Sequence, residues 1–401
     1  MPAFTPHTMQ PVARHDEQSR QDFVGALRAH LSGRVMPGIY RVYASKVEPA
    51  FVARHGRPPE REDEVRECMT QDPFYQFWSA LQRRSQELLW ESVIDPTERE
   101  LPALIDRARQ LSDRARQSAD RAAKTPQRNG GRAKSRGQQP RHGSLRLDPT
   151  LAIPRYHTAV DIHLQPGAYH TECTADDVAA GVIYDKGINL YMGGALGPEN
   201  NLMGDTLLAF LRASAPTHRP ERILDMGCAI GNSTLVWARA FPEAKVHGID
   251  VGAPVLRYAH ARAEAFGVAV DFSQQNAEHT DFADGSFDLV VSHIMLHETS
   301  KSALSRILAE SRRLLAPGGL MLHLEIPRGT NAIEKFMHNW ESYNNNETFS
   351  RYMTLVDLRA EAVKAGFAAD AVKVEEFAPQ LDVAQMNYAE HFRWKILVAG
   401  R

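Results

Sequence analysis

The sequence predicts an α/β fold with a seven-stranded sheet whose last strand is antiparallel, preceded by an all-helical N-terminal domain. From about residue 221, short apolar runs alternate with amphipathic helical segments, as in a parallel sheet covered by helices on both faces. The final run, RWKILVAG, follows VKVEEF with no helical pattern between them, which indicates a hairpin-like antiparallel addition. Residues before about 117 show repeated helical spacing.

The apolar runs define the elements that we expect in the second half of the chain. Strands are expected at 222–226, 246–250, 269–273, 287–292, 319–326, 371–377 and 392–399. Helices are expected near 232–240, 253–266, 302–315 and 354–365. The carboxyl ends of such parallel strands form the edge of the sheet where ligands bind.

Three helices are predicted in the N-terminal domain. RQDFVGALRAHLSG places Phe23, Leu27 and Leu31 on one face, with Gly33 as a stop. DPFYQFWSALQRRSQELLWESVI is the second helix, with Asp72-Pro73 as cap and first-turn proline, and LPALIDRARQLSDRARQ is the third. The aromatic stripe of the second helix favours a packing or dimer face over a wall of a substrate pocket.

Composition divides the chain into four parts. These are a helical N-terminal domain for dimerisation or as a lid (1–117), a basic flexible linker (118–147), a lead-in and active-site cover (148–220) and the α/β domain (221–401). Between Arg121 and Arg146 there are eight Lys or Arg and no acid, which favours a solvated tether. Phosphate contacts with RNA are the alternative.

The overall composition excludes several classes of protein. The 401 residues carry a net charge of −2, which argues against a dedicated nucleic-acid binder. Three widely separated cysteines are no disulfide framework and fit a reducing cytosol. The first residues lack the apolar core of a signal peptide, and no apolar run approaches the roughly 20 residues of a membrane span. We therefore expect a cytoplasmic protein with no membrane partner.

The stretch ILDMGCAIGNST leaves the first predicted strand and opens a helix. Its spacing, Asp225-x-Gly227-x-x-x-Gly231, differs from the dinucleotide fingerprint, which has no acid before its first glycine. A carboxylate at this turn suits a ligand with a cationic or hydroxyl-bearing part better than a pyrophosphate. Asp250, at the end of the next strand, can accept both hydroxyls of a ribose. The two features together predict a ribose-bearing ligand.

Four motifs in order carry a resemblance to a known family. LDMGCAIG, GIDVG, NAE…DGSFDLVVSHIMLHE and LLAPGGLM resemble the motif set of class I S-adenosylmethionine-dependent methyltransferases, in particular the ubiquinone/menaquinone-biosynthesis-like small-molecule group. The resemblance covers roughly residues 200–401. It implies a Rossmann-like seven-stranded sheet and S-adenosylmethionine as the cofactor.

The resemblance also implies cofactor contacts. The residues that it places there are Tyr184, Tyr191, Asp225, Gly227, Cys228, Ala229, Gly231, Asp250, Val251, Asn276, Ala277 and His293. The turn from Asp225 to Gly231 would hold the methionine part, Asp250 the ribose hydroxyls and Asn276 the adenine edge. Two positions depart from the family pattern: Asn276, where an acid is common, and Ala229, where a glycine is common.

Catalytic groups are expected at the carboxyl edge of the sheet. An oxygen nucleophile often needs a general base, and a carbon nucleophile needs a carboxylate to stabilise cationic character. His297 and Glu298 follow the fourth strand and are the first candidates, with His163 as a third. Helix capping or a buried hydrogen bond is the alternative. No metal is expected, because His293 and His297 lack the H-E-x-x-H pattern.

Two further segments are predicted to shape the site of the methyl acceptor. VDIHLQPGAYHTE is interpreted as a turn between two extended pieces, with Asp161 and His163 on one face. EKFMHNWESYNNNETFSRYM is an insertion with aromatic and amide side chains, including Asn344 to Asn346. The predicted substrate contacts are Tyr169, His170, Trp340 and Tyr343. Surface loops are the alternative for both segments.

These patterns lead to one expected function and its alternatives. We expect methyl transfer from S-adenosylmethionine to a small or mid-sized organic metabolite, by O-, C- or N-methylation, in specialised metabolism. The alternatives are a non-methylating use of the cofactor, such as cyclisation, and a non-catalytic cofactor-binding or scaffold protein. RNA methylation is disfavoured because no Asn-Pro-Pro-Tyr type tetrapeptide follows the fourth strand. The expected partners are the methyl acceptor and a second copy bound through the N-terminal helices.

Overall fold

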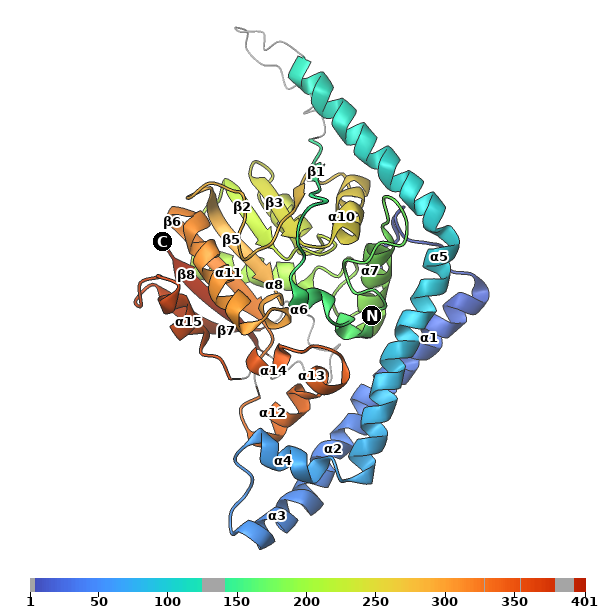
Figure 1. Cartoon of the computed structure of the whole chain (residues 1–401), viewed down its shortest axis with the longest axis vertical. Coiled ribbons are helices and arrows are strands. Elements are labelled where there is room, and N and C mark those ends of the chain that lie inside the picture. The colour runs from blue at the N-terminus through green and yellow to red at the C-terminus, as the bar shows by residue number, and fades with distance from the viewer. Residues whose placement is uncertain (1–3, 125–140, 328, 354, 379–392) are drawn as a thin grey trace.

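The computed structural model describes residues 4–124, 141–327, 329–353, 355–378 and 393–401. Its centre is a single sheet with strands in the order β1-β4-β3-β2-β5-β6-β8-β7 (Figure 1). The strands are β1 (Ser144–Arg146), β2 (Arg222–Met226), β3 (Lys245–Asp250), β4 (Asp271–Gln274), β5 (Phe287–His293), β6 (Leu315–Glu325), β7 (Val372–Phe377) and β8 (Trp394–Gly400). Strand β8 is antiparallel to both β6 and β7.

The Rossmann-like α/β fold with an antiparallel last strand is thus confirmed, but the predicted number of strands is wrong. The described sheet has eight strands, because β1 pairs in parallel with β4 at the edge. Strand β6 also begins at Leu315, earlier than predicted. Leu315 pairs with Phe287, and the register shifts before Leu320 pairs with Leu289. The Pro317-Gly318 segment therefore lies in a bulge, and not before the strand.

Helices cover both faces of the sheet, as the sequence predicts. One face carries α8 (Leu202–Ser214), α9 (Thr234–Ala240) and α10 (Ala253–Ala265), and the other carries α11 (Lys301–Leu314) and α15 (Leu358–Lys364). Ile223 belongs to the first apolar cluster and its neighbour Leu224 to the second. Successive strand residues point to opposite faces, so both layers are anchored by the same strand.

The N-terminal helices are longer than predicted. α1 (His15–His30), α2 (Met36–Val42) and α3 (Glu48–His55) follow one another through two π-helical turns, and α4 (Glu62–Met69) comes next. Gly33 lies inside the first π turn and is not a stop; the helical path ends at Gly56, whose φ is +72°. The second and third predicted helices are a single helix, α5 (Pro73–Lys124), with Pro96 and Pro102 inside it.

The inward face of α1 also differs from the prediction. Phe23 is 61% exposed, whereas Val24 and Leu31 are buried. Buried polar contacts explain the shift. Arg28 donates to Ser85 Oγ and Gln86 Oε1, and so faces α5. Apolar periodicity alone cannot detect a helix face that includes a buried arginine.

The segment predicted as a flexible linker is partly regular structure. Residues 118–124 continue α5, and residues 144–146 form β1. Residues 125–140 of the predicted linker lie outside the described residues. Helix α5 packs along α1, α7 (Ala179–Tyr191) and α10, so the helical region lies directly against the α/β domain (Figure 1). The division into four domains stays a prediction.

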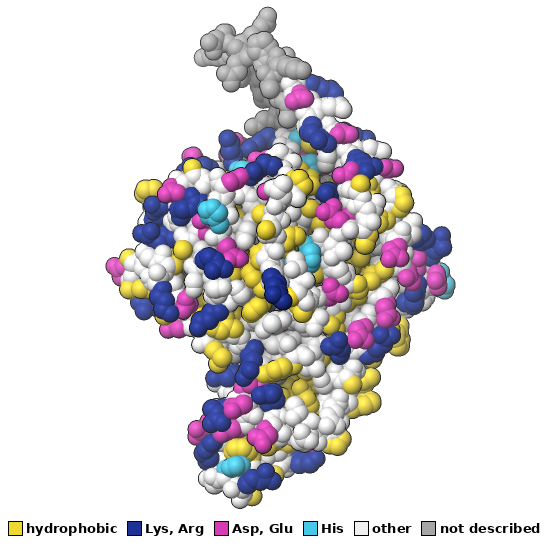
Figure 2. Space-filling model, in the orientation of Figure 1, with side chains coloured by type: hydrophobic (Ala, Val, Ile, Leu, Met, Phe, Trp, Pro, Cys, Tyr) yellow, Lys and Arg dark blue, Asp and Glu magenta, His cyan; other side chains and the backbone are white. Residues whose placement is uncertain are grey.

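The surface carries both signs of charge. Figure 2 shows Lys and Arg side chains interspersed with Asp and Glu over the visible face. Within the described ranges, no helix combines the length and the apolar character that a membrane crossing needs.

Candidate active site

The glycine turn after β2 brings the backbone close to the carboxyl edge of the sheet. Gly227 and Gly231 have φ values of +69° and +72°. The N–H groups of Gly227 and Cys228 both donate to the Ile249 carbonyl, at 2.8 and 2.9 Å. A Cβ added at Gly227 would overlap the side chain of Met295. The turn therefore depends on glycine at this position.

Asp250 ends β3 beside this turn. Its Oδ2 accepts from the Ala229 N–H at 3.0 Å, and its Oδ1 accepts from the Gly252 N–H at 2.9 Å. Burial raises the pKa of Asp250, and the Gly252 N–H and His157 counter that effect. Each oxygen keeps a lone pair beyond its backbone bond. The carboxylate is thus held in place and can still accept from a ligand.

A cavity of about 420 Å³ opens at this edge, and a smaller cavity of about 70 Å³ adjoins it. Gly227, Asp250 and Glu298 line both cavities. The predicted cofactor residues on the larger cavity are Tyr184, Tyr191, Asp225, Gly227, Cys228, Ala229, Asp250 and His293. Val251, Asn276 and Ala277 line the smaller one. Gly231 is not among the lining residues; it turns the chain into α9. The structure therefore places the remaining predicted cofactor residues around two neighbouring cavities that share lining residues.

Asp225 is fixed by two side chains. Its Oδ2 accepts from Thr234 Oγ1 at 2.6 Å, and its Oδ1 lies 3.2 Å from Nδ1 of His293. The Trp237 indole N–H donates to Nε2 of His293 at 3.4 Å. Because Nε2 accepts, Nδ1 carries the proton and donates to Asp225. Both residues line the larger cavity with a set orientation.

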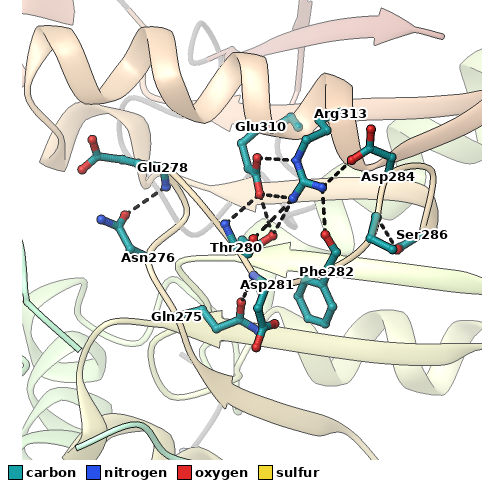
Figure 3. Close-up of polar contacts among 12 residues, drawn as sticks. Gln275, Asn276, Glu278, Thr280, Asp281, Phe282, Asp284, Ser286, Glu310 and Arg313 are labelled. Carbon is teal, nitrogen blue, oxygen red and sulfur yellow. Dashed lines mark hydrogen bonds and ion pairs between the residues drawn. The ribbon is translucent and has the colours of Figure 1, made fainter. Parts of the chain in front are cut away.

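The loop that carries Asn276 is braced by Arg313 of α11 (Figure 3). The Arg313 guanidinium binds Glu310 at 2.7 and 2.8 Å, Asp284 at 2.7 Å and the Phe282 carbonyl at 2.8 Å. Glu310 in turn accepts from the N–H and hydroxyl of Thr280 at 2.7 and 2.6 Å. We call this set of contacts the Arg313 latch. It fixes the β4–β5 loop to α11.

The three predicted catalytic residues lie together. Nε2 of His163 is 2.8 Å from Glu298 Oε1, and Nε2 of His297 is 3.6 Å from the same oxygen. Nδ1 of His163 is 2.9 Å from Glu347 Oε1. The extended pieces predicted around His163 are wrong. Residues 162–164 form a short 3₁₀ turn in which His163 has a φ of +57°, so Asp161 is exposed while His163 lines the cavity.

Three carboxylates complete this group, and the sequence reading did not single them out. Glu325 ends β6, and its Oε2 is 2.9 Å from Nδ1 of His297. Glu341 of α13 (Trp340–Asn344) and Glu347 accept from the Asn345 amide at 2.7 and 3.1 Å. The members of this acid–histidine cluster are His163, His297, Glu298, Glu325, Glu341, Asn345 and Glu347. The position of Glu325 at the carboxyl end of a strand is the signal that could have found it.

The two histidines of the cluster are held in their charged forms. Burial disfavours the imidazolium of His163, but Glu347 and Glu298 outweigh it and keep the pKa of His163 well above its usual range. Burial likewise lowers the pKa of His297, yet Glu325 raises it to about 9. Near neutral pH both rings therefore donate hydrogen bonds to carboxylates.

Two carboxyls of the cluster have divergent pKa values. Burial and the neighbouring Glu347 raise the pKa of Glu341 to about 8. Burial acts in the same direction on Glu347, but His163 lowers the pKa of Glu347 to about 2. Near neutral pH Glu341 is therefore largely protonated, whereas Glu347 is ionised.

The predicted substrate contacts are only partly at the cavity. Tyr169 lines it, with its ring edge-on to Tyr184 at 5.2 Å. His170, Trp340 and Tyr343 are not among the lining residues. Trp340 is 4% exposed and its indole N–H donates to Ser79 Oγ at 2.8 Å, so it packs against α5. Tyr343 is 45% exposed. The insertion contributes acids to the cavity where we expected aromatic rings.

An apolar surface lines the rest of the larger cavity. Its members include Ile188, Met192, Leu196, Met203, Ile326, Met337 and Trp394. Met337 belongs to α12 (Ala332–His338), next to α13 and α14 (Ser350–Met353) in the insertion after β6. Among the residues that the structure describes, no group of three or more His, Cys, Asp or Glu is arranged to hold a metal ion.

Comparison with known proteins identifies the domain around the glycine turn. Residues 223–319 match the family model described as a methyltransferase domain. Demethylmenaquinone methyltransferase from Thermus thermophilus is 37% identical over 108 residues, which are 27% of this chain and 48% of that protein. Malonyl-[acyl-carrier protein] O-methyltransferase from Geobacter sulfurreducens is 32% identical over 156 residues, 37% of this chain and 56% of that protein. The chain spans about half the length of these relatives.

Solved structures are similar to about half of the chain, at low TM-scores. Phosphoethanolamine N-methyltransferase 2 from Haemonchus contortus, in complex with S-adenosyl-L-methionine, has a TM-score of 0.37 and 20% sequence identity, over 49% of this chain and 52% of that one. The matched residues 223–319 hold the glycine turn, Asp250 and the Arg313 latch. The part of the chain that holds the glycine turn and Asp250, residues 223–319, therefore matches the methyltransferase domain family.

Proposed function

We propose that this protein transfers a methyl group from S-adenosylmethionine to a nucleophilic atom of a small or mid-sized organic acceptor. One observation supports this most directly. A single cavity joins the glycine turn and Asp250 to the acid–histidine cluster. A donor site and a set of proton-handling groups thus share one space, as an in-line displacement requires.

The residues of the two cavities suit the cofactor. Gly227 lines both cavities, so its backbone can contact a ligand there, and Asp250 can still accept hydroxyl donors. Val251, Asn276 and Ala277 would hold the adenine in the smaller cavity. When bound, S-adenosylmethionine supplies an electrophilic methyl group on a positively charged sulfur. The protein then has to orient the acceptor and exclude water.

The acid–histidine cluster can accept a proton from the nucleophile. Glu298 lies between His163 and His297 and is in contact with both. We assign to Glu298 the acceptance of a proton from the nucleophile, with His163 and His297 as the groups that orient it. Tyr169, Tyr184 and Tyr191 line the same cavity and would shield the reacting atoms from water.

Two observations support a small organic acceptor: the apolar lining of the larger cavity and the names of the related proteins. An apolar surface suits the body of an organic molecule. The relatives include a ubiquinone biosynthesis O-methyltransferase from Erwinia tasmaniensis and a trans-aconitate 2-methyltransferase from Rhodopseudomonas palustris. Both names support a small-molecule acceptor. The interspersed surface charges in Figure 2 give no support to RNA as the acceptor.

The helical region would act as part of the active-site cover and as a dimerisation surface. The side chains of Gln86 and Trp90 on α5 both donate to the His163 carbonyl, at 3.1 and 2.7 Å. Phe23 and Phe77 expose large rings on α1 and α5. A second copy bound there would cover these rings, and sedimentation velocity at several concentrations tests for it.

The reaction is tested by mass spectrometry. The chain is incubated with S-adenosylmethionine carrying a deuterated methyl group and a panel of small phenols, carboxylic acids and amines. We expect one acceptor to gain the labelled methyl group together with an equal amount of S-adenosylhomocysteine, and the Glu298→Gln variant to lose most of this turnover. A product with altered mass but no label would replace the proposal with a non-methylating reaction. Binding of the cofactor without any product from the panel or from a cell extract would favour the scaffold alternative.

A further inference from the structure

Among the residues that the structure describes, the acid–histidine cluster would lack one positive charge if all four of its carboxyls were ionised. Its acids are Glu298, Glu325, Glu341 and Glu347, and the cations that face them are His163, His297 and Arg28. Arg28 lies behind the cavity, with its guanidinium 4.3 Å from the centre of the Tyr191 ring. We propose that the methyl acceptor carries an amine, whose ammonium group binds against Glu341 and Glu347 and supplies the missing charge. This inference rests on the function proposed above.

The state of Glu341 supports a site for a cation. Its carboxyl lines the cavity together with that of Glu347. Burial and Glu347 raise the pKa of Glu341 to about 8, against the opposing effect of His163. The carboxyl thus holds a proton while no further cation is present, and an ammonium group beside it favours its ionised form.

Asn345 gives a second and independent reason. Its side chain is 1% exposed and lies inside the cluster, where the amide N–H groups donate to Glu341 at 2.7 Å and to Glu347 at 3.1 Å. Its Oδ1 has no hydrogen-bond partner among the described residues. The cluster therefore contains one buried acceptor that no described donor satisfies. An ammonium group brings three N–H donors, whereas a hydroxyl brings one.

The apolar part of the cavity defines the rest of the molecule. Its side chains include Ile188, Met192 and Met337. An apolar body would pack there while the amine faces the acids. The structure thus points to an apolar or aromatic amine as the substrate class, and to Glu341 as the residue that distinguishes an amine from an alcohol.

Proton and charge balance are satisfied for such a substrate. The ammonium form first gives one proton to Glu298, the proton acceptor assigned above, which lines the same cavity. This leaves a neutral amine with a free lone pair. A carbon–nitrogen bond then forms as the carbon–sulfur bond of the cofactor breaks, and its electron pair stays on sulfur. The positive charge moves from sulfur to nitrogen, next to Glu347.

Calorimetry with two matched probes tests the inference. 2-Phenylethylamine and 2-phenylethanol are titrated at pH 7 into the chain saturated with S-adenosylhomocysteine, in two buffers with different enthalpies of ionisation. We expect the amine to bind at least tenfold more tightly than the alcohol, and its binding to release close to one proton as Glu341 ionises. Glu341→Gln should abolish both the preference and the proton release. Glu341→Asp should keep the preference, and Glu243→Gln, at an exposed acid, should change neither.

Several results would overturn the inference. Equal binding of amine and alcohol by the wild type does so, as does an amine preference that survives in Glu341→Gln. If Glu341→Gln does not fold, the wild type alone decides. Amine binding without proton release then overturns the inference, and release of close to one proton supports it. Glu341→Gln could weaken the binding of S-adenosylmethionine and leave the binding of S-adenosylhomocysteine unchanged. The missing cation would then be the sulfonium of the cofactor, and the inference of an amine would be overturned. A wild type that does not bind S-adenosylhomocysteine overturns the proposed function itself.

Discussion

His163 shows how a distant helix determines the position of a single residue in the site. Its φ of +57° and that of Leu164, +58°, lie in the left-handed region, which costs about 1–2 kcal/mol per residue. The Trp90 indole and the Gln86 amide of α5 both donate to the His163 carbonyl and hold this turn. The sequence indicates His163 as a candidate, but its backbone conformation depends on contacts with residues more than 70 positions away.

The pair formed by His297 and Glu325 makes stability depend on pH. The folded pKa of His297 is raised to about 9, so the stabilisation by its charged form is complete below its usual pKa of 6.5 and is lost as the pH rises through 9. We expect His297→Asn to be less stable than the wild type by about 2–3 kcal/mol at pH 6. This difference should narrow as the pH rises from about 6.5 to 9, as measured by urea unfolding.

A matched control separates this effect from a general loss of a histidine. His279 is exposed, so His279→Asn should leave the free energy of unfolding close to that of the wild type at each pH. If the difference in free energy of unfolding between the wild type and His297→Asn stays constant from pH 6 to 10, the assignment of a charged His297 is contradicted.

At the scale of elements, the Arg313 latch should govern the adenine side of the site. Arg313→Ala removes the contacts to Glu310 and Asp284 and leaves the buried Glu310 without its cationic partner, which should lower stability by about 2–4 kcal/mol. The freed β4–β5 loop should also weaken binding of S-adenosylhomocysteine, measured by calorimetry below the unfolding temperature. Arg312→Ala, on the same helix, is the control. Unchanged cofactor affinity in Arg313→Ala would show that the latch serves stability alone.

The packing of α7 on α5 gives a second prediction at this scale. A Cβ at Gly187 would overlap the Trp90 ring, whereas a Cβ at Gly25 of α1 would meet no atom within 4 Å. We expect Gly187→Ala to destabilise the protein by about 1–3 kcal/mol and to disturb the Tyr184–Tyr191 cover. Gly25→Ala should stabilise it by about 0.5–1 kcal/mol, through helix propensity. Thermal unfolding of both variants tests this. Equal changes in the melting temperature of the two variants would contradict the packing of α7 on α5.

The elements differ in how far the sequence could predict them. Strands β2, β3 and β5 are close to their predicted positions because apolar runs ending in turn residues are local signals. The break predicted between residues 94 and 101 is absent, since packing on α1, α7 and α10 keeps α5 helical through Pro96 and Pro102. Strand β1 was missed because three residues with two exposed side chains carry no apolar pattern.

For the whole molecule, the cofactor side was more predictable than the acceptor side. The glycine turn and Asp250 lie at fixed places in the fold, so sequence order determines their meeting at one edge. Glu341 and Glu347 reach the cavity through an insertion whose path depends on its packing against α5, as with Trp340 on Ser79. No local pattern contains that information, and the predicted aromatic contacts therefore lie elsewhere.

We propose that the cavity at the carboxyl edge of the sheet is a site for S-adenosylmethionine. Titration calorimetry of the wild type and of Asp250→Ala with S-adenosylhomocysteine tests it most directly, with Asp370→Ala at an exposed position as the control. We predict one site per chain for the wild type and for Asp370→Ala. For Asp250→Ala we predict at least tenfold weaker binding, since the ribose hydroxyls lose a charged acceptor worth about 1.5–3 kcal/mol. No binding by the wild type, or equal affinity in Asp250→Ala, would contradict the account.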